Sequence, residues 1–416
     1  MNKGWIAGFC FLLISLSGWT QVKFTDITAT SGIDHQFEVF EGMFGGGICA
    51  FDYDNDGFED LFLTSGMQQD KLYRNNGDGT FTDVYEGSGL EVTRHYVTQG
   101  VAGADVNKDG WVDLFLTTIT SKDSVKLIPR EINLFFLNNG DGTFRDATRE
   151  YRLSNYNSFS TAAAFGDVNQ DGYIDLYVGN YFLAYEGKLS VISDATIVGA
   201  NQTSQDYLLI NKEGKYFVDA YEEYDLDHRG FGFGGVFTDY DNDGDIDIIV
   251  NNDFGYKAVP NYLLRNDYPR RRFTDVTEEM EMDLKINSMG TAVGDYNEDG
   301  ILDYFFTNIR WNWFMTHEQM DDPFEDVLKK LKMNVVTISW GANFADFDQD
   351  GDVDLFVGNG DLNPNCVPMA NFYYENEGAG GFTDMAPFNG MNHYGMARGS
   401  VAFDLENDGD LDLIVV

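Results

Sequence analysis

The chain alternates between short apolar runs and polar turns, and this pattern repeats along almost its whole length. Each unit opens with a strand rich in glycine and alanine, which leads into a nine-residue acidic loop. A second, apolar strand leaves the loop, for example Leu114–Leu116 or Leu355–Val357. A third apolar strand, such as Leu134–Leu137, precedes a turn rich in Asn and Gly, and a fourth strand begins with Phe, as in Phe144–Ala147. The pattern predicts four short antiparallel strands per unit.

The acidic loop has the sequence D-x-[DN]-x-D-G-x-x-D, and it occurs in seven copies that are 51 to 72 residues apart. In the last copy Glu406 stands at the third position. Units of four antiparallel strands that repeat in this way are typical of a β-propeller. We therefore predict an all-β fold, a seven-bladed β-propeller with one acidic loop per blade. The loops begin at Asp52, Asp105, Asp167, Asp239, Asp295, Asp346 and Asp404.

A small residue stands five positions before each leading aspartate. The first strand of a propeller blade lies nearest the central axis, where neighbouring backbones leave little room for side chains. A small residue at one offset in all seven copies therefore indicates that these strands are the innermost ones. The seven residues are Gly47, Gly100, Ala162, Gly234, Gly290, Gly341 and Gly399.

The two ends of the chain are expected to meet in one blade. Phe24–Thr28 matches the fourth-strand phrase of other units, such as Phe81–Val84, but no acidic loop precedes it. We therefore expect it to form the outermost strand of the blade around Asp404. That blade would still lack a third strand, because the sequence stops at Val416, within the second strand. Residues 22–416 are thus expected to form one propeller with an incomplete last blade, in a chain that is truncated or naturally of this length.

Residues 1–21 have the features of a secretory signal peptide. Lys3 supplies a positive charge, and the apolar run Ile6–Leu16 is too short to span a membrane. No other transmembrane segment is predicted, so we expect an exported protein that is secreted or held at the cell surface or in the periplasm. Cys49 and Cys366 could form at most one disulfide bond, so the fold is not expected to depend on a framework of disulfides. Cys49 is expected to be a small buried side chain of an inner strand.

The composition limits the class of partner. A net charge of -42 at pH 7 excludes a polyanion such as nucleic acid as the expected ligand. The chain is 43% hydrophobic and 15% aromatic, which argues against the disorder common in acidic proteins. The seven loops hold 30 of the 69 acidic residues, and these would repel each other without bound cations.

The acidic loops are the candidate metal sites, and the alternative is that they are solvated turns. Alternating carboxylates around a glycine turn suit Ca²⁺, which takes about six to eight oxygen ligands, whereas Mg²⁺ favours fewer carboxylates. No loop contains the His or Cys that zinc or copper would favour. An EF-hand is excluded because it needs Glu at position 12, where these loops carry apolar residues such as Leu63. We predict up to seven Ca²⁺ sites. The candidate ligands at loop positions 1, 3, 5 and 9 are Asp52, Asp54, Asp56 and Asp60; Asp105, Asn107, Asp109 and Asp113; Asp167, Asn169, Asp171 and Asp175; Asp239, Asp241, Asp243 and Asp247; Asp295, Asn297, Asp299 and Asp303; Asp346, Asp348, Asp350 and Asp354; and Asp404, Glu406, Asp408 and Asp412.

Two longer segments interrupt the repeat, and long loops on a rigid scaffold often carry function. Residues 180–206 lengthen one unit. In residues 310–334 the apolar spacing predicts a helix over 323–332 in place of a hairpin. Trp311 and Trp313 lie outside the strand pattern and form the candidate surface for a partner, because exposed aromatic residues anchor proteins or stack on sugars.

Other polar features carry weaker predictions. His95, His228 and His393 precede three of the leading aspartates by 10 or 11 residues, so a histidine ring near one mouth of the channel is conceivable. We favour the alternative that the three histidines are unrelated loop residues, because their distances from the leading aspartates differ and four units have no such histidine. Arg270–Arg272 replaces an Asn-Gly turn and is expected to be an exposed hairpin tip. No hydrolase, metalloprotease or phosphate-loop motif is present.

The repeat units resemble a known family. Phe165–Leu176, with the sequence F-G-D-V-N-Q-D-G-Y-I-D-L, is similar to FG-GAP/VCBS repeats, the calcium-bearing blades of propellers such as integrin α-subunit heads. The phrase N-N-G-D-G-T-F-x-D, as in Asn138–Asp146, resembles more narrowly the cartilage acidic protein/UnbV-type family of secreted propellers. The resemblance implies a seven-bladed, calcium-binding propeller used in adhesion or extracellular recognition. Members of that family commonly carry a UnbV-type C-terminal domain, which this sequence does not contain.

These observations favour an exported, calcium-stabilised propeller without enzymatic activity, which binds an extracellular protein or glycan through its loops. An alternative is a secreted carbohydrate-active enzyme on the same fold, since a fold does not settle function. A cleft lined by acids outside the seven loops, close to Trp311 or Trp313, would favour that alternative. A third possibility is a structural arm for another domain.

Overall fold

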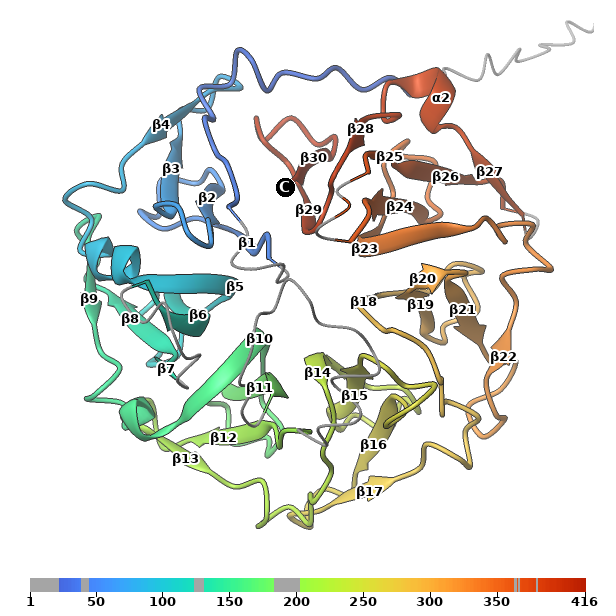
Figure 1. Ribbon diagram of the computed structural model, residues 1–416, viewed down its shortest axis with the longest axis horizontal. Helices are drawn as coiled ribbons and strands as arrows, with labels where there is room; N and C mark the ends of the chain where they lie inside the picture. The colour runs from blue at the N-terminus through green and yellow to red at the C-terminus, as the bar shows by residue number, and fades with distance from the viewer. Residues whose placement is uncertain are drawn as a thin grey trace, which may run out of the picture.

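The computed structural model describes residues 22–38, 45–122, 131–182, 203–362, 365, 367–378 and 381–416. It is an all-β propeller, in which six sheets of four or five strands stand as blades around a common axis (Figure 1). Six of the seven predicted blades are therefore complete sheets. The predicted signal peptide, residues 1–21, lies outside the described residues, as does Cys366. No helix in the described part of the chain is long and apolar enough to cross a membrane.

The strands pair in the predicted order of an antiparallel meander. In the first blade Ile48 pairs with Leu63, Leu61 pairs with Tyr73, and Asn75 pairs with Phe81. The six sheets, in order of strand pairing, are β1 (Ile48–Phe51), β2 (Asp60–Leu63), β3 (Lys71–Asn75) and β4 (Phe81–Asp83); β5 (Tyr96–Ala104), β6 (Asp113–Ser121), β8 (Leu134–Asn138) and β9 (Phe144–Asp146); β13 (Phe217–Asp219), β12 (Tyr207–Asn211), β11 (Asp175–Phe182), β10 (Asn157–Gly166) and β7 (Glu131–Ile132); β14 (Gly232–Thr238), β15 (Asp247–Asn252), β16 (Tyr262–Asn266) and β17 (Phe273–Asp275); β18 (Gly290–Gly294), β19 (Asp303–Thr307), β21 (Trp313–Thr316) and β22 (Glu325–Asp326); and β20 (Ile309–Arg310), β23 (Thr337–Ala345), β24 (Asp354–Asn359), β26 (Phe372–Asn376) and β27 (Phe382–Asp384).

The seventh unit forms a two-stranded sheet of β29 (Ser400–Phe403) and β30 (Asp412–Val415). β29 contacts both β23 and β1, so this sheet lies between the last and the first complete blade (Figure 1). A second small sheet pairs β25 (Met369–Ala370) with β28 (Tyr394–Gly395). The described helices are short: the 3₁₀-helices η1 (Glu91–His95) and η2 (Leu153–Asn155), and the α-helix α2 (Ala386–Asn389).

The inner strands are crowded at the axis, as the small residues predicted. A β-carbon added at Gly47 would lie 2.5 Å from the carbonyl oxygen of Gln99 in the next blade, and one added at Gly290 would lie 2.7 Å from that of Trp340. Hydrogen bonds also link neighbouring blades near these inner strands. For example, the Thr64 hydroxyl donates to Gln99 O of the next blade at 2.6 Å. The interfaces further out are packed with apolar side chains of the second and third strands, such as Phe62, Leu72 and Leu114.

The segment predicted to be a helix, residues 323–332, is not one, and this prediction was wrong. Glu325–Asp326 forms the outer strand β22, which pairs with β21, and a turn follows over residues 328–332. The apolar residues at 324, 327, 328 and 331 have helical spacing because one turn closes with a Leu331 N–H bond to Val327 O at 2.9 Å. Phe324 is buried in the interface with the preceding blade, so the hairpin of this unit is retained.

Candidate metal centres in the acidic loops

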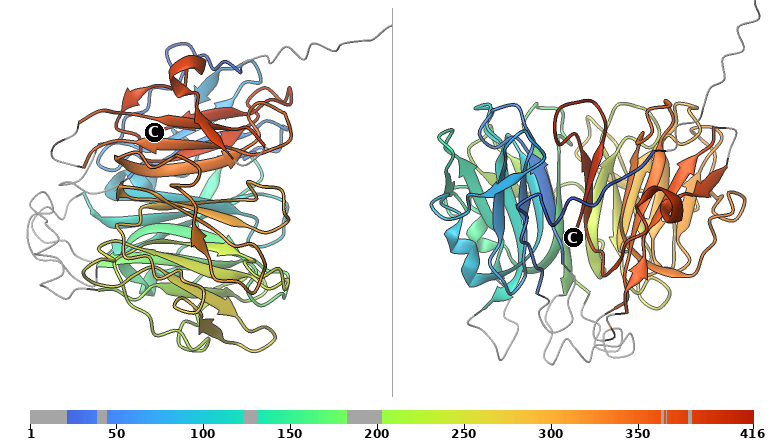
Figure 2. Two further views of the ribbon diagram at one scale, coloured as in Figure 1. Left: turned by 90° about the vertical axis from the view of Figure 1, so that its right-hand side faces the viewer. Right: turned by 90° about the horizontal axis from the view of Figure 1, so that it is seen from above.

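All seven acidic loops join the first two strands of their units, so they lie at one end of the blades. We call this end the acidic face; the third-to-fourth strand turns lie there too, because the strands alternate in direction. The connections between the second and third strands lie at the opposite end. Figure 2 shows the two ends as the upper and lower rims of the ring in its right-hand view.

Each leading aspartate holds its own loop in shape through backbone hydrogen bonds. Asp52 Oδ1 accepts the Asp56 N–H at 3.0 Å, and its Oδ2 accepts the Gly57 N–H at 2.8 Å. Asp239 makes the same two bonds, both at 3.0 Å, to Asp243 and Gly244. The glycine at loop position 6 has a positive φ, 95° at Gly57, which glycine adopts without steric cost. The loop conformation is thus encoded by its Asp and Gly residues.

Three of the seven loops bring three carboxylates together. In each, one oxygen from each of three side chains lies within 4.8 Å of the others, which is close enough for one cation to bind all three. Two of the clusters combine loop positions 1, 3 and 9, and the third combines positions 1, 3 and 5. The clusters are Asp52, Asp54 and Asp60; Asp239, Asp241 and Asp247; and Asp346, Asp348 and Asp350.

Two carboxylate oxygens in these clusters fit a metal ion particularly well. Asp54 Oδ1 and Asp241 Oδ1, both at loop position 3, are buried and have no hydrogen-bond partner in the described structure. Burial and the nearby Asp243 carboxylate raise the pKa of Asp241. A buried oxygen without a donor is costly unless a cation or water satisfies it. The donor set is all oxygen, which suits Ca²⁺.

The aspartate at loop position 9 has a structural role that the sequence did not indicate. Asp60 is fully buried; its Oδ2 accepts the Tyr53 N–H at 3.0 Å and its Oδ1 accepts the Asn75 N–H at 2.7 Å. It therefore ties the loop to the third strand. Burial raises the pKa of Asp60 to about 7, and that of its counterpart Asp247 to about 8. A bound cation would favour the ionised form of these groups.

The asparagine that ends most third strands was also missed as a structural residue. The Asn75 amide donates to Leu405 O at 2.8 Å, and the Asn138 amide donates to Tyr53 O at 2.8 Å. Each bond links a blade to the acidic loop of the preceding unit. In sequence these residues look like ordinary turn asparagines, and only their recurrence at one offset could have revealed the role.

The other four loops, within the described structure, do not bring three carboxylates together. Three of them have Asn at position 3, so they lack one carboxylate. The Asn side-chain amide forms hydrogen bonds within its own loop. Asn107 accepts the Asp109 N–H at 2.9 Å and donates to Asp109 Oδ2 at 2.8 Å. In the last loop Glu406 Oε1 approaches Gly79 of the first blade, 2.9 Å from where a β-carbon would stand there. The predicted ligands in these loops are therefore close in sequence but do not form a carboxylate cluster.

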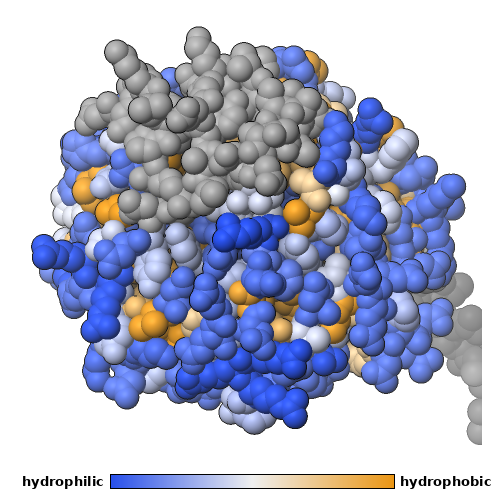
Figure 3. All heavy atoms as spheres, turned by 60° about the horizontal axis from the view of Figure 1, so that its bottom comes forward, coloured by the Kyte–Doolittle hydropathy of each residue, from blue (hydrophilic) through white to orange (hydrophobic). Residues whose placement is uncertain are grey.

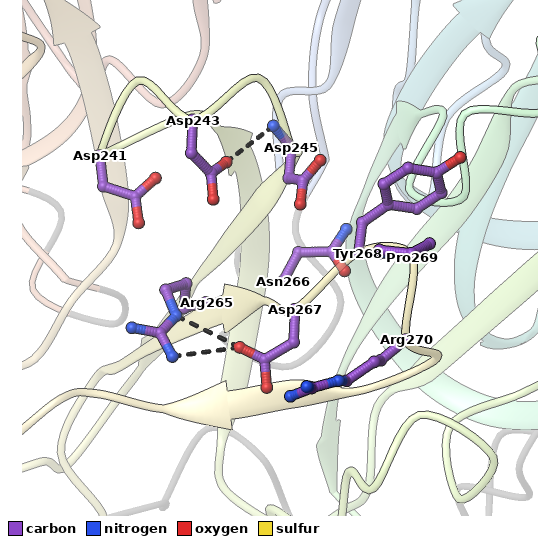
Figure 4. Close-up of a pocket in the computed structure, with 9 residues that line it drawn as sticks. All are labelled: Asp241, Asp243, Asp245, Arg265, Asn266, Asp267, Tyr268, Pro269 and Arg270. Carbon is purple, nitrogen blue, oxygen red and sulfur yellow. Dashed lines mark hydrogen bonds and ion pairs between the residues drawn. The ribbon is translucent and has the colours of Figure 1, made fainter.

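In two blades an arginine at the fourth position of the third strand brings a positive charge close to the acidic loop. Arg74 Nε lies 2.8 Å from Asp54 Oδ2, and its guanidinium also lies 2.7 Å from Asp56 Oδ2. Arg265 stands at the same position in another blade, but its guanidinium bonds Asp267 at 3.1 Å (Figure 4). Arg265, Asp267 and Asp241 line one pocket of about 360 Å³. Arg74 thus pairs with two carboxylates of its own loop, whereas Arg265 pairs with Asp267 outside its loop.

The remaining candidates fall at separate places. His95 and His393 are exposed, and the His228 ring bonds Asp275 at 3.1 Å, so the preference for separate loop residues agrees with the structure. None of the three clusters above contains a histidine. Arg270–Arg272 is an exposed hairpin tip, as predicted, and Arg271 pairs with Glu223 of the neighbouring blade.

The aromatic insert and the inner cysteine also have clear positions. Trp311 is 50% exposed, whereas Trp313 packs in the interface that contains Phe306. Trp311 precedes β21 and therefore lies at the end of the ring opposite the acidic face. Neither described pocket is lined by either tryptophan. Cys49 lies half-buried on the inner strand β1, and burial raises the pKa of its thiol to about 12.

The family model described as FG-GAP-like repeat matches residues 52–116, 105–178, 239–306, 295–357 and 346–415. Together with the propeller fold and its acidic loops, this match shows that the chain belongs to the FG-GAP-like repeat family.

Among curated proteins, the chain is distantly homologous to cartilage acidic protein 1. It is 29% identical to the Xenopus tropicalis protein over 209 residues, which are 50% of this chain and 28% of that protein. It is 28% identical to the Homo sapiens protein over 196 residues, 46% of this chain and 26% of that protein. The chain thus spans about a quarter of the length of these relatives.

Two solved structures resemble the fold. BBS1N in complex with ARL6DN aligns with a TM-score of 0.51 at 9% identity, covering 92% of this chain and 91% of the other. An Agrocybe aegerita lectin that recognises terminal N-acetylglucosamine aligns with a TM-score of 0.47 at 14% identity, covering 90% and 86%. The identity to BBS1N is low, so that likeness concerns the fold alone.

Proposed function

We propose that this chain is an exported, Ca²⁺-binding propeller without enzymatic activity, and that it serves as an adhesion or recognition scaffold for an extracellular protein or glycan. The observation that carries the proposal is the trio of carboxylate clusters, with buried, unpartnered oxygens at Asp54 and Asp241. The sheet β29–β30 is, in this proposal, the inner half of a seventh blade, and up to seven loops bind Ca²⁺ with differing affinities.

Bound Ca²⁺ would act as a structural link and as a counter-charge. In the first loop Asp52, Asp54 and Asp60 would hold an ion, with Asp56 as a further proposed ligand, and Asp60 also anchors the third strand. An ion that binds the folded chain far better than the unfolded chain adds stability by mass action. Extracellular calcium modules bind with dissociation constants of about 10⁻⁴ to 10⁻³ M, so the sites would fill outside the cell.

The metal part of the proposal is tested by thermal unfolding in Ca²⁺ and then in excess chelator. We expect chelation to lower the melting temperature. The double variant Asp54→Asn/Asp241→Asn should reduce this difference, whereas Glu222→Gln, at an exposed acid outside the loops, should not. A melting temperature that is unchanged by chelator in the unsubstituted protein would contradict the proposal.

The recognition part is tested at Trp311. One face of the molecule, seen in Figure 3, is largely hydrophilic with scattered apolar patches. The indole of Trp311 is 50% exposed, and an exposed indole can anchor a partner. Binding to arrays of glycans and extracellular proteins would be compared for the unsubstituted protein, for Trp311→Ala, and for Tyr268→Ala on the acidic face. We expect Trp311→Ala alone to lose signal. Equal loss in both variants, or in neither, would contradict a binding site at Trp311.

A further inference from the structure

Trp311 is carried by a turn of unusual backbone geometry. Two asparagines close this turn: the Asn308 amide donates to Trp311 O at 2.7 Å, and Asn312 Oδ1 accepts the Asn308 N–H at 3.0 Å. Arg310, inside the turn, has a φ of 91°, whereas every other described non-glycine residue with a positive φ lies between 53° and 63°. A side chain makes this conformation costly, and such strain is retained where it serves a function. The turn thus presents the exposed indole at a cost in backbone strain.

A second exposed apolar segment flanks the same turn. β20 pairs with β23 through Ile309 with Ile338 and Arg310 with Thr337. The next residue on the first strand is Trp311, and the residue opposite it in this direction is Val336. Val336 is 63% exposed, so the indole and the valine lie at the same end of this short ladder and both face solvent.

The chain that leads to Val336 carries three lysines. Residues 328–332 form a turn, in which the Lys332 N–H donates to Lys329 O at 3.2 Å, and the apolar residues of this turn are buried between two blades. The side chains of Lys329, Lys330 and Lys332 are exposed. Four residues of chain from Lys332 to Val336 span at most about 14 Å. Both segments connect strands at the end of the ring opposite the acidic face, so the lysines and the indole share one face.

This part of the surface differs from the rest of the chain in charge. Residues 304–316 and 327–345 contain no Asp or Glu, although the chain has 69 acidic residues among 416. The acids just before the second segment, Glu325 and Asp326, belong to the outer strand β22. At physiological ionic strength, exposed charges more than about 8 Å apart are largely screened, so a ligand meets local positive charge in spite of the acidic chain. Four exposed cations form no ion pair in the described structure: Arg310, Lys329, Lys330 and Lys332.

We infer that Trp311, Val336 and these four cations form a binding site, the basic patch, for an anionic oligosaccharide whose sugars carry carboxylate or sulfate groups. The inference rests on the proposed recognition role of Trp311 and names the class of ligand. The apolar face of one sugar ring stacks on the indole. The acidic groups of this sugar and its neighbours accept charge-assisted hydrogen bonds from Arg310 and the lysines.

The shape of the surface favours a sugar over an acidic peptide. Neither described pocket is lined by residues of the basic patch, so the described structure offers a flexible chain no groove here. A peptide on an open surface loses the freedom of each backbone residue that it orders, whereas sugar rings are rigid and lose less. Cations on two separate segments also match the repeated acidic groups of an oligosaccharide better than a single charged end.

The test measures the anisotropy of three fluorescent hexasaccharides, one of uronic acids, one sulfated and one neutral, titrated with the full chain at fixed Ca²⁺. We expect saturable binding of an anionic hexasaccharide and none of the neutral one. Lys329→Gln/Lys330→Gln/Lys332→Gln should weaken this binding about tenfold, because it removes three charges from the basic patch. Trp311→Ala should weaken it about fivefold through the loss of stacking.

A control variant separates the basic patch from the overall charge of the protein. Arg149→Gln/Lys215→Gln/Arg270→Gln removes the same charge from three exposed positions outside the basic patch. It should bind the anionic hexasaccharide as the unsubstituted protein does. The substituted residues of both triple variants are exposed, and equal melting temperatures would show that all proteins compared are folded.

Four outcomes overturn the inference. They are absence of binding by both anionic hexasaccharides, equal binding of the neutral one, equal weakening in both triple variants, and equally tight binding of a hexapeptide of glutamates, which would make an acidic peptide the occupant. The proposed function fails separately. If Trp311→Ala still loses signal for another glycan or protein on the arrays, the recognition role of Trp311 stands without an anionic sugar.

Discussion

The substitution Asp70→Asn should stabilise the protein at neutral pH. Asp70 precedes the third strand of the first blade and is 1% exposed. Its Oδ1 accepts the Ser65 N–H at 2.8 Å and the Thr98 hydroxyl at 2.7 Å, while its Oδ2 is buried without a hydrogen-bond partner in the described structure. Asn stands at this position in four other blades, for example Asn133, whose Oδ1 accepts the Thr118 N–H at 2.9 Å.

The magnitude follows from the shifted pKa. Burial is the main cause that raises the pKa of Asp70 from 3.8 to about 6. A shift of about two pKa units corresponds to about 3 kcal/mol, the cost of ionising the buried carboxyl at pH 7. Asn keeps the Oδ1 acceptor but adds an amide group that needs partners, which costs about 1 to 2 kcal/mol. We therefore expect a net gain of about 1 to 2 kcal/mol in the free energy of unfolding at pH 7.

The sign of the pH dependence distinguishes this mechanism from better packing. Because the folded-state pKa is raised, the favourable contribution of Asp70 is complete below pH 4 and is lost as the pH rises through about 6. The advantage of Asp70→Asn should therefore grow between pH 4 and pH 6 and stay level above. Urea unfolding at fixed Ca²⁺ from pH 4 to pH 7.5 measures it, with Asp227→Asn, at an exposed position, as the control. A constant difference at every pH would refute the reasoning.

Three further substitutions test other parts of the account. Arg74→Leu places at this position the residue type found at the equivalent position of the second blade, Leu137. It should raise the Ca²⁺ affinity of the first loop severalfold, because it removes a guanidinium that competes with the ion for the carboxylates. Calorimetric titration measures this affinity, and an unchanged value would show that Arg74 does not compete. Leu72→Ala should lower the free energy of unfolding by about 2 to 5 kcal/mol, because Leu72 is fully buried between blades; a loss below about 1 kcal/mol in urea would contradict that packing. Gly47→Ala should lower the free energy of unfolding by about 1 to 3 kcal/mol in the same assay, because the added methyl group would meet backbone atoms. The control Gly381→Ala, with open space around it, should lower it by less than about 0.5 kcal/mol. Equal losses in the two variants would contradict crowding at the axis.

The sequence predicted the blades well because their determinants are local. The Asp and Gly residues of each loop fix its turn through their own backbone bonds, and the Asn-Gly turns set the outer hairpins. The small residues at the axis were equally informative, since seven copies at one offset reveal a constraint that a single glycine would not. Comparison of the seven copies therefore revealed a constraint from contacts between blades, which the sequence of one unit does not show.

The parts that the sequence did not reveal depend on contacts between units. Asp60 looked like a metal ligand only, because its bond to the Asn75 N–H joins residues from different strands. Asn75 looked like a turn residue, although its amide bonds Leu405, which is 330 residues away in the chain. The apolar spacing that begins at Phe324 resembled a helix because a single turn follows it, while Phe324 itself is fixed by packing against the preceding blade.

The Asn or Glu at position 3 of four loops is visible in the sequence, but one further difference between the loops could not be predicted. The nine-residue phrase is nearly the same in all seven copies, but the third-strand neighbour decides whether a cation or a guanidinium meets the carboxylates. Arg74 and Arg265 occupy the same position and bond different acids, which depends on whether an acid such as Asp267 follows nearby. Side-chain competition of this kind requires coordinates.

The most direct test of the central claim is equilibrium dialysis of the metal-free protein against Ca²⁺, with the bound ion counted per chain by atomic spectroscopy. The account predicts at least three bound Ca²⁺ at millimolar free Ca²⁺, from the loops that begin at Asp52, Asp239 and Asp346, and tighter binding in the first loop when Arg74 is replaced by Leu. No bound Ca²⁺ at millimolar concentration, in either protein, would contradict the claim and leave the acidic loops as solvated turns.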